Sequence, residues 1–325
     1  MSLGGKHDCE YESDPRQNKD LANSLIGKNV IIAGAGRGIG RATAEFFART
    51  AASSVSLIAL ELPEVEETAR VCKVINPTLI VRTAAFNVTD FAAVQAFVDG
   101  TADDLGGIDV VFMNAGRPPQ FLPIHESEPN IWWDTVAVSL QGSFNFARAV
   151  VPLMRQSAKG GTLIFTSSAA AHVTAGMGAY TIGKLGTSRL AEILHHENKD
   201  AGIKTFSIHP GVVRTRFYTD FAEAVEGNIK DDGSSYVSSR VPGDVKSAKA
   251  AVSFLKDVPA DTPQMPAGMV LVLASGRLDF MSGRYVDSSK KVEAYLADRE
   301  RILKEDAYRV KIVIGTDEYL PTWMD

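Results

Sequence analysis

From Lys28 onward, short apolar runs alternate along the chain with longer segments in which apolar residues recur every three or four positions. Six of the short runs have the length and the β-branched or apolar composition of strands, namely 29–34, 54–60, 78–86, 108–116, 161–168 and 203–211. A helical segment or a loop follows each of them. This alternation predicts an α/β fold, a doubly wound parallel sheet with helices on both faces, in three αβα layers.

Four polar or glycine-rich segments each begin where one of these runs ends. They are "AGAGRGIG" after the first run, "MNAG" after the fourth, "TSSAAAH" after the fifth and "HPGVVRT" after the sixth. Right-handed crossovers bring the carboxyl ends of parallel strands to one edge of the sheet, where ligands bind. We therefore expect these segments to line one crevice, in a fold of the Rossmann type.

The first of these segments has glycine where a phosphate-binding turn needs it. Gly34, Gly38 and Gly40 allow a tight turn and a close approach of the backbone to a pyrophosphate. The helix that follows offers its N–H groups and its positive dipole end. The spacing is G-x-x-x-G-x-G, and Gly34 with Gly36 also forms a G-x-G pair. The segment predicts a dinucleotide site, and a glycine-rich turn without a ligand is the alternative.

Composition and charge limit the class of protein and of partner. The 325 residues are 45% hydrophobic and 22% charged, which suits one large domain or two smaller ones. The formal charge of −5, without a basic stripe, argues against nucleic acid as a partner. Cys9 and Cys72 lack the spacing of a zinc site, so no metal is expected.

The beginning of the chain and the apolar runs bear on location. Residues 1–24 are polar and charged, without the apolar core of a signal peptide, and are expected to form a flexible arm. No run reaches the roughly 18 apolar residues that a membrane span requires. We expect no membrane partner and a cytoplasmic location.

The motifs occur together in the order and at roughly the spacing of a known family. They are "GAGRGIG" (34–40), "NAG" (114–116), a serine after the fifth run, "YTIGK" (180–184) and "PGVVRT" (210–215). On these residues the chain resembles the short-chain dehydrogenase/reductase family from about Lys28 to Asp287. The resemblance implies a single Rossmann-type catalytic domain over 25–289, which interconverts a carbonyl and an alcohol with an NAD(P) cofactor.

The resemblance gives Tyr180 the role of acid and base, and phenol chemistry shows why Lys184 accompanies it. A phenol has a pKa near 10 and exchanges protons near neutral pH only when its anion is stabilised. Lys184, one helical turn further on, and the positive charge of an oxidised nicotinamide would do so. Lys184 would also hold the nicotinamide ribose.

A serine hydroxyl after the fifth run would bind the substrate oxygen. Counting forward from Gly161 favours Ser168, whereas counting back from Tyr180 at the usual loop length favours Ser167. We choose Ser168, because strand registers vary less than loops.

The resemblance also implies which residues bind the cofactor. They are Gly34, Gly36, Arg37, Gly38, Ile39, Gly40, Asn87, Val88, Asn114, Ala115, Gly116, Tyr180, Lys184, Pro210, Gly211, Val213 and Thr215. An acid that ends the second run would favour NAD, and a nearby Arg would favour NADP. Ala59 and Leu60 stand at that end, Glu61 comes next, and Arg37 lies in the glycine turn. We expect NADP, with NAD as the alternative.

The chain departs from the family pattern at several positions. Family members usually have Asn at the position of Ser139, where it supports a water between the active-site Lys and solvent. Ser139 is shorter, which puts the proton relay in question, and Asn145 lies on a different helix face. Ala33, Met113 and Asn87 also replace the usual Thr, Asn and Asp. These changes leave a second hypothesis open, a dinucleotide-binding protein without redox activity, either a binding module or a non-redox enzyme.

Substrate recognition is expected from the loop 117–133 and from 216–265, which we interpret as a lid region. Four residues can line an apolar pocket for a ketone or secondary alcohol larger than a few carbons, with a place in the core or at an interface as the alternative for each: Phe121, Met177, Phe217 and Tyr218. Family members commonly pair through their fourth and fifth helices, which implies a homodimer or homotetramer. Residues 290–325 should add an amphipathic helix and a short strand, which cover the sheet edge or dock on a partner subunit.

Overall fold

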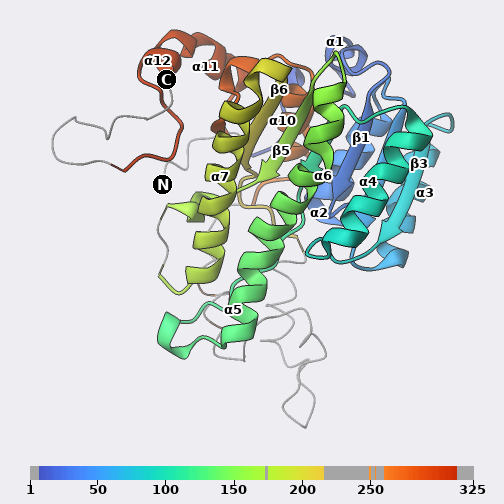
Figure 1. Cartoon of the computed structure of the whole chain (residues 1–325). Coiled ribbons are helices and arrows are strands. Elements are labelled where there is room, and N and C mark those ends of the chain that lie inside the picture. The colour runs from blue at the N-terminus through green and yellow to red at the C-terminus, as the bar shows by residue number, and fades with distance from the viewer. Residues whose placement is uncertain (1–6, 173–174, 216–248, 250–252, 254–259, 313–325) are drawn as a thin grey trace.

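The structure, a computed structural model, describes residues 7–172, 175–215, 249, 253 and 260–312 (Figure 1). All strands of its sheet are parallel, in the order β3-β2-β1-β4-β5-β6-β7, which confirms the predicted Rossmann-type fold. The strands are β1 (Asn29–Ala33), β2 (Ser54–Ala59), β3 (Ile80–Ala85), β4 (Val110–Met113), β5 (Gly161–Thr166), β6 (Ile203–His209) and β7 (Arg284–Asp287). The apolar pattern did not single out β7, because this short edge strand contributes only one fully buried apolar side chain, Val286.

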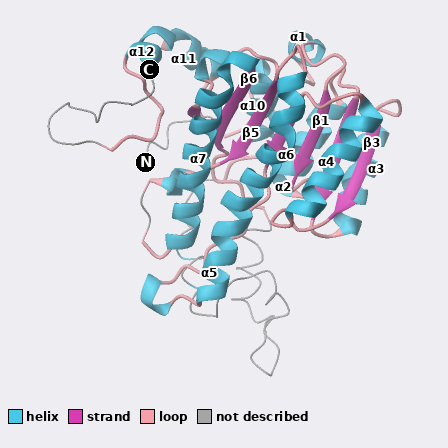
Figure 2. Cartoon of the chain, viewed as in Figure 1, coloured by secondary structure: helices cyan, strands magenta, loops and turns pink. Residues whose placement is uncertain are grey.

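Helices cover both faces of the sheet (Figure 2). One face carries α2 (Gly38–Ala48), α3 (Leu62–Ile75) and α10 (Gln264–Ala274). The other carries α4 (Phe91–Leu105), α6 (Gly142–Gln156) and α7 (Gly178–Asn198). A π-helical turn, Ala137–Gln141, joins α5 (Pro129–Val136) to α6.

The strands distribute their side chains between two apolar cores. In β1, Val30 and Ile32 enter the core under α2 and α10, while Ile31 and Ala33 enter the core under α4, α6 and α7. Successive side chains of a strand point to opposite faces, so a strand buried on both sides must be apolar throughout. This explains why β1 and β4 read as continuous apolar runs in the sequence.

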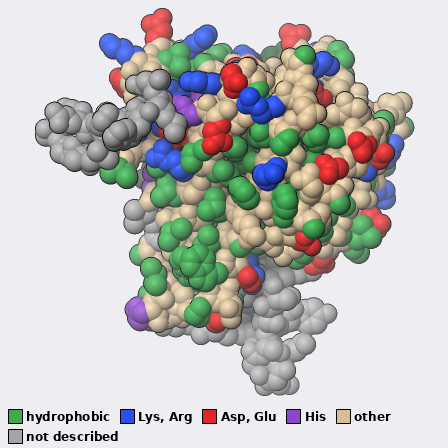
Figure 3. Space-filling model, viewed as in Figure 1, with side chains coloured by type: hydrophobic (Ala, Val, Ile, Leu, Met, Phe, Trp, Pro, Cys, Tyr) green, Lys and Arg blue, Asp and Glu red, His purple; other side chains and the backbone are tan. Residues whose placement is uncertain are grey.

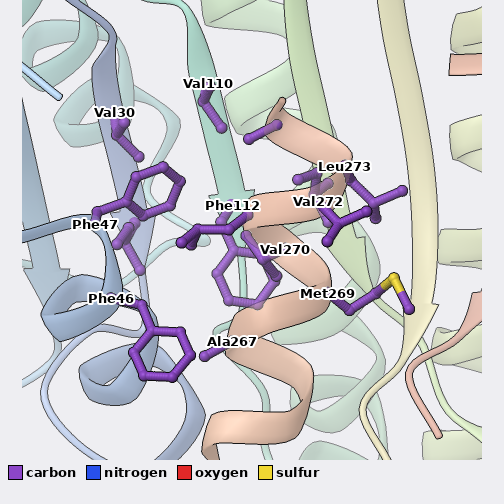
Figure 4. Close-up of a cluster of buried hydrophobic side chains, with 14 of the residues drawn as sticks. Val30, Phe46, Phe47, Val110, Phe112, Ala267, Met269, Val270, Val272 and Leu273 are labelled. Carbon is purple, nitrogen blue, oxygen red and sulfur yellow. The ribbon is translucent and has the colours of Figure 1, made fainter. Parts of the chain in front are cut away.

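Helix α10 is buried almost completely. Every residue after Gln264 is buried, and its side chains meet Phe46, Phe47 and Phe112 (Figure 4). At Gly268 a Cβ atom would overlap the Ser13 carbonyl, so the N-terminal segment packs directly on this helix. A helix that is apolar all round is typical of a core position.

Residues 7–24 differ from the flexible arm expected at 1–24. They form a 3₁₀ turn (Tyr11–Ser13) and α1 (Lys19–Asn23), whose first turn is capped by Asn18, which accepts a hydrogen bond from the Leu21 amide (3.0 Å). Leu21 is buried in the core under α2 and α10. Few side chains of this segment are apolar, so the sequence shows no helical periodicity here. This is why the segment was expected to be a flexible arm.

The C-terminal extension also differs in part from its expected form. The expected helix is split into α11 (Val292–Ala297) and α12 (Arg299–Lys304), and residues 308–312 form no strand. Tyr295 is fully buried, and its hydroxyl donates to the Asp287 carbonyl and accepts from the Asp287 amide. The described part of the tail therefore packs on the sheet edge at β7. The remaining residues, 313–325, and most of the lid region lie outside the described residues.

Replacing Leu21 by Ala tests the docking of the N-terminal segment. The substitution should lower the free energy of unfolding by about 2–5 kcal/mol, because it removes buried methyl groups and leaves a cavity. Ile26→Ala is the matched control, since that side chain is 67% exposed. Urea unfolding curves of the two variants measure the difference, and equal stabilities would contradict a docked segment.

Candidate functional site

The glycine turn between β1 and α2 has a backbone that only glycine adopts easily. Gly34 and Gly38 have positive φ angles of 84° and 53°. A Cβ atom on Gly34 would lie 2.6 Å from the Ala115 amide nitrogen, and one on Gly40 would overlap the Gly34 carbonyl. The turn and the end of β4 therefore approach more closely than side chains would allow.

The start of α2 offers a site for an anion. Within the described chain, no side chain caps this end, and the first turn contains no acidic residue. Uncapped N–H groups and the positive helix end favour a phosphate. Ile39 packs beneath the turn against the core, and Gly36 is buried where the turn meets Ala59 and Glu64. These residues fit the pyrophosphate of a dinucleotide.

A chain of hydrogen bonds connects this turn to the helix that carries Lys184. The Asn114 side chain donates to the Gly34 carbonyl (3.1 Å), and the Thr166 hydroxyl donates to Asn114 Oδ1 (3.3 Å). Lys184 Nζ then donates to the Thr166 carbonyl (2.7 Å). The ends of β1, β4 and β5 and helix α7 are thus connected through side chains.

Tyr180 and Lys184 lie together on α7, as the spacing predicts. Lys184 Nζ is 5.5 Å from the centre of the Tyr180 ring, and Lys184 is buried. Burial lowers the pKa of the Lys184 amine to about 8 and raises the pKa of the Tyr180 phenol to about 12. A hydrogen bond with Ser168 acts in the opposite direction on the phenol. The two groups are thus near each other and partly removed from water.

The two candidate serines point to different places. The Ser168 hydroxyl forms a hydrogen bond with the Tyr180 side chain and accepts another from the Ala170 amide (3.1 Å). Ser167 is fully buried, and its hydroxyl donates to the Lys184 carbonyl (2.9 Å) and pairs with Ser188 (2.8 Å). This geometry favours Ser168 for contact with a substrate.

Ser139 lies in the π-helical turn, packed against α7. A Cβ atom on Gly183 would lie 3.3 Å from the Ser139 Cβ. The Ser139 hydroxyl is buried and has no hydrogen-bond partner among the described residues, while its carbonyl accepts from Ser143 (2.6 Å) and Thr187 (3.3 Å). The Asn145 side chain faces elsewhere and donates to the Val88 carbonyl (2.9 Å).

The predicted residues that follow β3 and β4 have local roles as well. The Asn87 side chain accepts from the Thr89 amide (3.1 Å), which shapes the turn before α4. Val88 packs against Gly142, where a Cβ atom would lie 2.7 Å from a Val88 methyl group. At Gly116 a Cβ atom would lie 3.6 Å from Lys184 Nζ, so this backbone faces the Lys184 amine.

The segment after β6, residues 210–215, closes over the glycine turn. Thr215 contacts Gly38, where a Cβ atom would lie 2.6 Å from the Thr215 methyl group. Asp261 holds the middle of the segment, because it accepts from the Val212 amide (2.6 Å) and forms a parallel bridge with Val213. No sequence motif marks Asp261, because it reaches this segment from a distant part of the chain.

Arg37 does not present a free guanidinium group to the crevice. It donates to Glu64 in the first turn of α3 (Nη1 to Oε1, 3.1 Å). No motif marks Glu64 either, because it lies beyond the end of β2, where an acid is usually sought. The expected NADP preference depended on Arg37, and in this pair the negative charge of Glu64 offsets the positive charge of Arg37.

The expected substrate pocket is only partly described. Phe121 has a positive φ of 54° and lies against Gly176, and Met177 is buried. Phe217 and Tyr218 lie outside the described residues. Among the residues that the structure describes, no cluster of His, Cys, Asp and Glu could hold a metal ion.

Comparisons with known proteins point to one family. A family model for short chain dehydrogenases matches residues 28–226. The short chain dehydrogenase citE of Monascus ruber is 31% identical over 294 residues, which cover 89% of each chain. The short chain dehydrogenase pigC of the same fungus is 26% identical over 298 residues, 90% of this chain and 89% of pigC.

Solved structures share the fold. A levodione reductase superposes with a TM-score of 0.69 at 24% identity, covering 81% of this chain and 96% of its own. An NAD⁺-bound xylitol dehydrogenase superposes with a TM-score of 0.66 at 22% identity, covering 81% of this chain and 98% of its own.

The buried Lys184 amine predicts how stability changes with pH. Its pKa is 10.5 in a model compound and about 8 in the folded chain. Between these values the unfolded chain binds a proton that the folded chain does not, so stability rises with pH. One pKa unit corresponds to about 1.4 kcal/mol, and most of the difference between the two pKa values lies between pH 8 and pH 10. Over this interval the free energy of unfolding of the unmodified protein should therefore rise by ~2 kcal/mol more than that of Lys184→Met. Urea unfolding at both pH values measures this, and a constant difference between the two proteins would contradict a perturbed amine.

Proposed function

The chain belongs to the short-chain dehydrogenase/reductase family of NAD(P)-dependent oxidoreductases that act on CH–OH groups, and we propose that it interconverts a carbonyl and a secondary alcohol on a moderately large, apolar small molecule. The observation that carries the proposal is the hydrogen bond between Ser168 and Tyr180 beside the buried Lys184 amine. A serine, a phenol and an amine in this arrangement suit proton transfer to or from an alcohol oxygen.

Each of the three side chains has a separate task in this reaction. A nicotinamide cofactor bound in this crevice would accept or supply the hydride. Tyr180, with a pKa of about 12, is protonated at neutral pH and donates its proton to the carbonyl oxygen in the direction of reduction. The Ser168 hydroxyl orients that oxygen, and the positive charge of Lys184 stabilises the phenolate that remains.

The dinucleotide would lie along the carboxyl ends of the strands. The glycine turn at 34–40 would hold its pyrophosphate, and Lys184 its nicotinamide ribose. The segments 87–88, 114–116 and 210–215 would complete the contacts that the family resemblance assigns to them. The glycines of this turn, where a side chain would not fit, and the uncapped start of α2 support this placement.

A homodimer or homotetramer is the assembly that we propose. Apolar side chains gather over α5, α6 and α7 on the surface (Figure 3). They include Trp133, Phe144, Ile182, Leu185 and Ile193. Exposed apolar groups on neighbouring helices favour association. No helix in the described part of the chain has the length and apolar character to cross a membrane.

Tyr180→Phe tests the catalytic proposal. The variant keeps the ring but loses the proton, so turnover should fall about 100- to 10,000-fold while dinucleotide binding persists. The measurement is the loss of NADPH or NADH absorbance against a panel of aliphatic, aromatic and polycyclic ketones. Dinucleotide binding with no Tyr180-dependent turnover on any ketone would favour the alternative, a dinucleotide-binding protein without redox activity.

The choice between the serines has its own test. Ser168→Ala should lower kcat by at least about tenfold, because the substrate oxygen loses a hydrogen-bond donor at the reacting centre. Ser167→Ala should keep more of its turnover and instead lower stability, since it breaks the buried bonds to Lys184 and Ser188. Full turnover in Ser168→Ala together with loss in Ser167→Ala would reverse the assignment.

A further inference from the structure

The end of β2 lacks the acid that distinguishes the two nicotinamide dinucleotides. In doubly wound folds an acid near this point accepts hydrogen bonds from the adenosine ribose, whereas an Arg accommodates the 2′-phosphate of NADP. This chain has Ala59 there, and its methyl group lies 3.1 Å from where Gly36 would carry a Cβ atom. The end of β2 thus touches the glycine turn but brings no charge to it.

A carboxylate reaches the same point from the next helix. A Cβ atom added to Gly36 would lie 3.0 Å from both the Cβ and the Oε2 atoms of Glu64. The Ala59 methyl group is next to the same point. Building on the proposed function, we propose that Glu64 takes the part of the missing acid. It accepts hydrogen bonds from the adenosine ribose hydroxyls and makes the protein prefer NAD to NADP.

Hydrogen bonds connect the backbone of Glu64 to the glycine turn. Arg41 Nη2 donates to the Gly36 carbonyl (2.6 Å) and to the Glu64 carbonyl (3.4 Å). The Thr68 hydroxyl, one helical turn further along α3, lies 2.9 Å from the Ala35 carbonyl, to which it donates. The first turn of α3 and the glycine turn therefore form one unit, which fixes where the carboxylate stands.

The sequence suggests that Arg37 would favour the 2′-phosphate of NADP, but in the structure Arg37 pairs with Glu64. Its guanidinium group pairs with Glu64 Oε1, whereas Oε2 is the oxygen that lies near Gly36. A carboxylate has about four acceptor sites, so a carboxylate that pairs with an Arg also accepts hydrogen bonds from other donors, such as a ribose hydroxyl. The pair also reduces the positive charge that a 2′-phosphate would need, and the carboxylate would repel that phosphate. This reverses the NADP preference that Arg37 and the small side chain of Ala59 suggest in the sequence.

An acid in the first turn of a helix also stabilises the helix through its dipole, by about 0.3–1 kcal/mol. That role affects both dinucleotides equally, because they differ only at the ribose 2′ position. The ratio of their dissociation constants is therefore insensitive to a general loss of stability. Glu67 provides the matched control, since it lies one turn further along α3 and pairs with Arg70 on the exposed surface.

The experiment is calorimetric titration of NAD⁺ and NADP⁺ into the full chain, into Glu64→Gln and into Glu67→Gln. The unmodified protein should bind NAD⁺ at least about tenfold more tightly than NADP⁺, a difference of about 1.4 kcal/mol. Glu64→Gln should weaken NAD⁺ binding several-fold and strengthen NADP⁺ binding, so that the ratio changes about tenfold or more. Glu67→Gln should leave the ratio unchanged.

Two results would overturn the proposal for Glu64. One is tighter binding of NADP⁺ than of NAD⁺ by the unmodified protein. The other is an NAD⁺ affinity in Glu64→Gln equal to that in Glu67→Gln. If either occurs while Tyr180-dependent turnover is present, only the role of Glu64 fails, whereas no binding of either dinucleotide would overturn the proposed function as well.

Discussion

The buried amine of Lys184 is the constraint around which this crevice is built. An ammonium group removed from water is costly unless it is hydrogen-bonded, and the Thr166 carbonyl at the end of β5 supplies that bond. The Thr166 hydroxyl orients Asn114, and Asn114 in turn holds the Gly34 carbonyl in the glycine turn. One buried charge thus sets the position of the parts that the proposed reaction needs: the turn for the pyrophosphate, the strand end behind Ser168 and the helix that carries Tyr180.

Much of this arrangement can be predicted from the sequence, because it depends on local rules. Strands buried on both faces read as apolar runs, and Tyr180 with Lys184 must share a helix face at their spacing. The residues that the sequence did not reveal act across long separations. Glu64 reaches the glycine turn from α3, and Asp261 reaches the segment after β6 from a distant part of the chain. No sequence motif next to either residue marks its role. The role of each becomes visible only when the helices and strands are packed together.

Under the proposed reaction, Tyr180 must regain a proton after each reduction, and Ser139, which packs against Gly183 on the same helix as Tyr180, has no side-chain amide to offer a relay. The Ser139 carbonyl is already occupied by two hydroxyl groups, and its own hydroxyl has no partner among the residues described. The Lys184 amine has a pKa of about 8, closer to neutral pH than the value of about 12 for Tyr180. Of the two groups, the amine therefore exchanges protons with its surroundings more readily near neutral pH. It is the better-matched donor for the phenolate, whatever route the proton takes from solvent.

The segment ahead of the family match also supports the crevice. Thr262 donates its amide proton to the His7 carbonyl (2.9 Å) and its hydroxyl proton to Asp8 (2.6 Å). His7 Nδ1 lies 2.6 Å from one oxygen of Asp261, whose other oxygen accepts from the Val212 amide. The segment after β6 is therefore held through Asp261 by residues that precede β1 by about twenty positions. An extension with few apolar residues contributes to the site through hydrogen bonds, which is why composition alone made it look like a free arm.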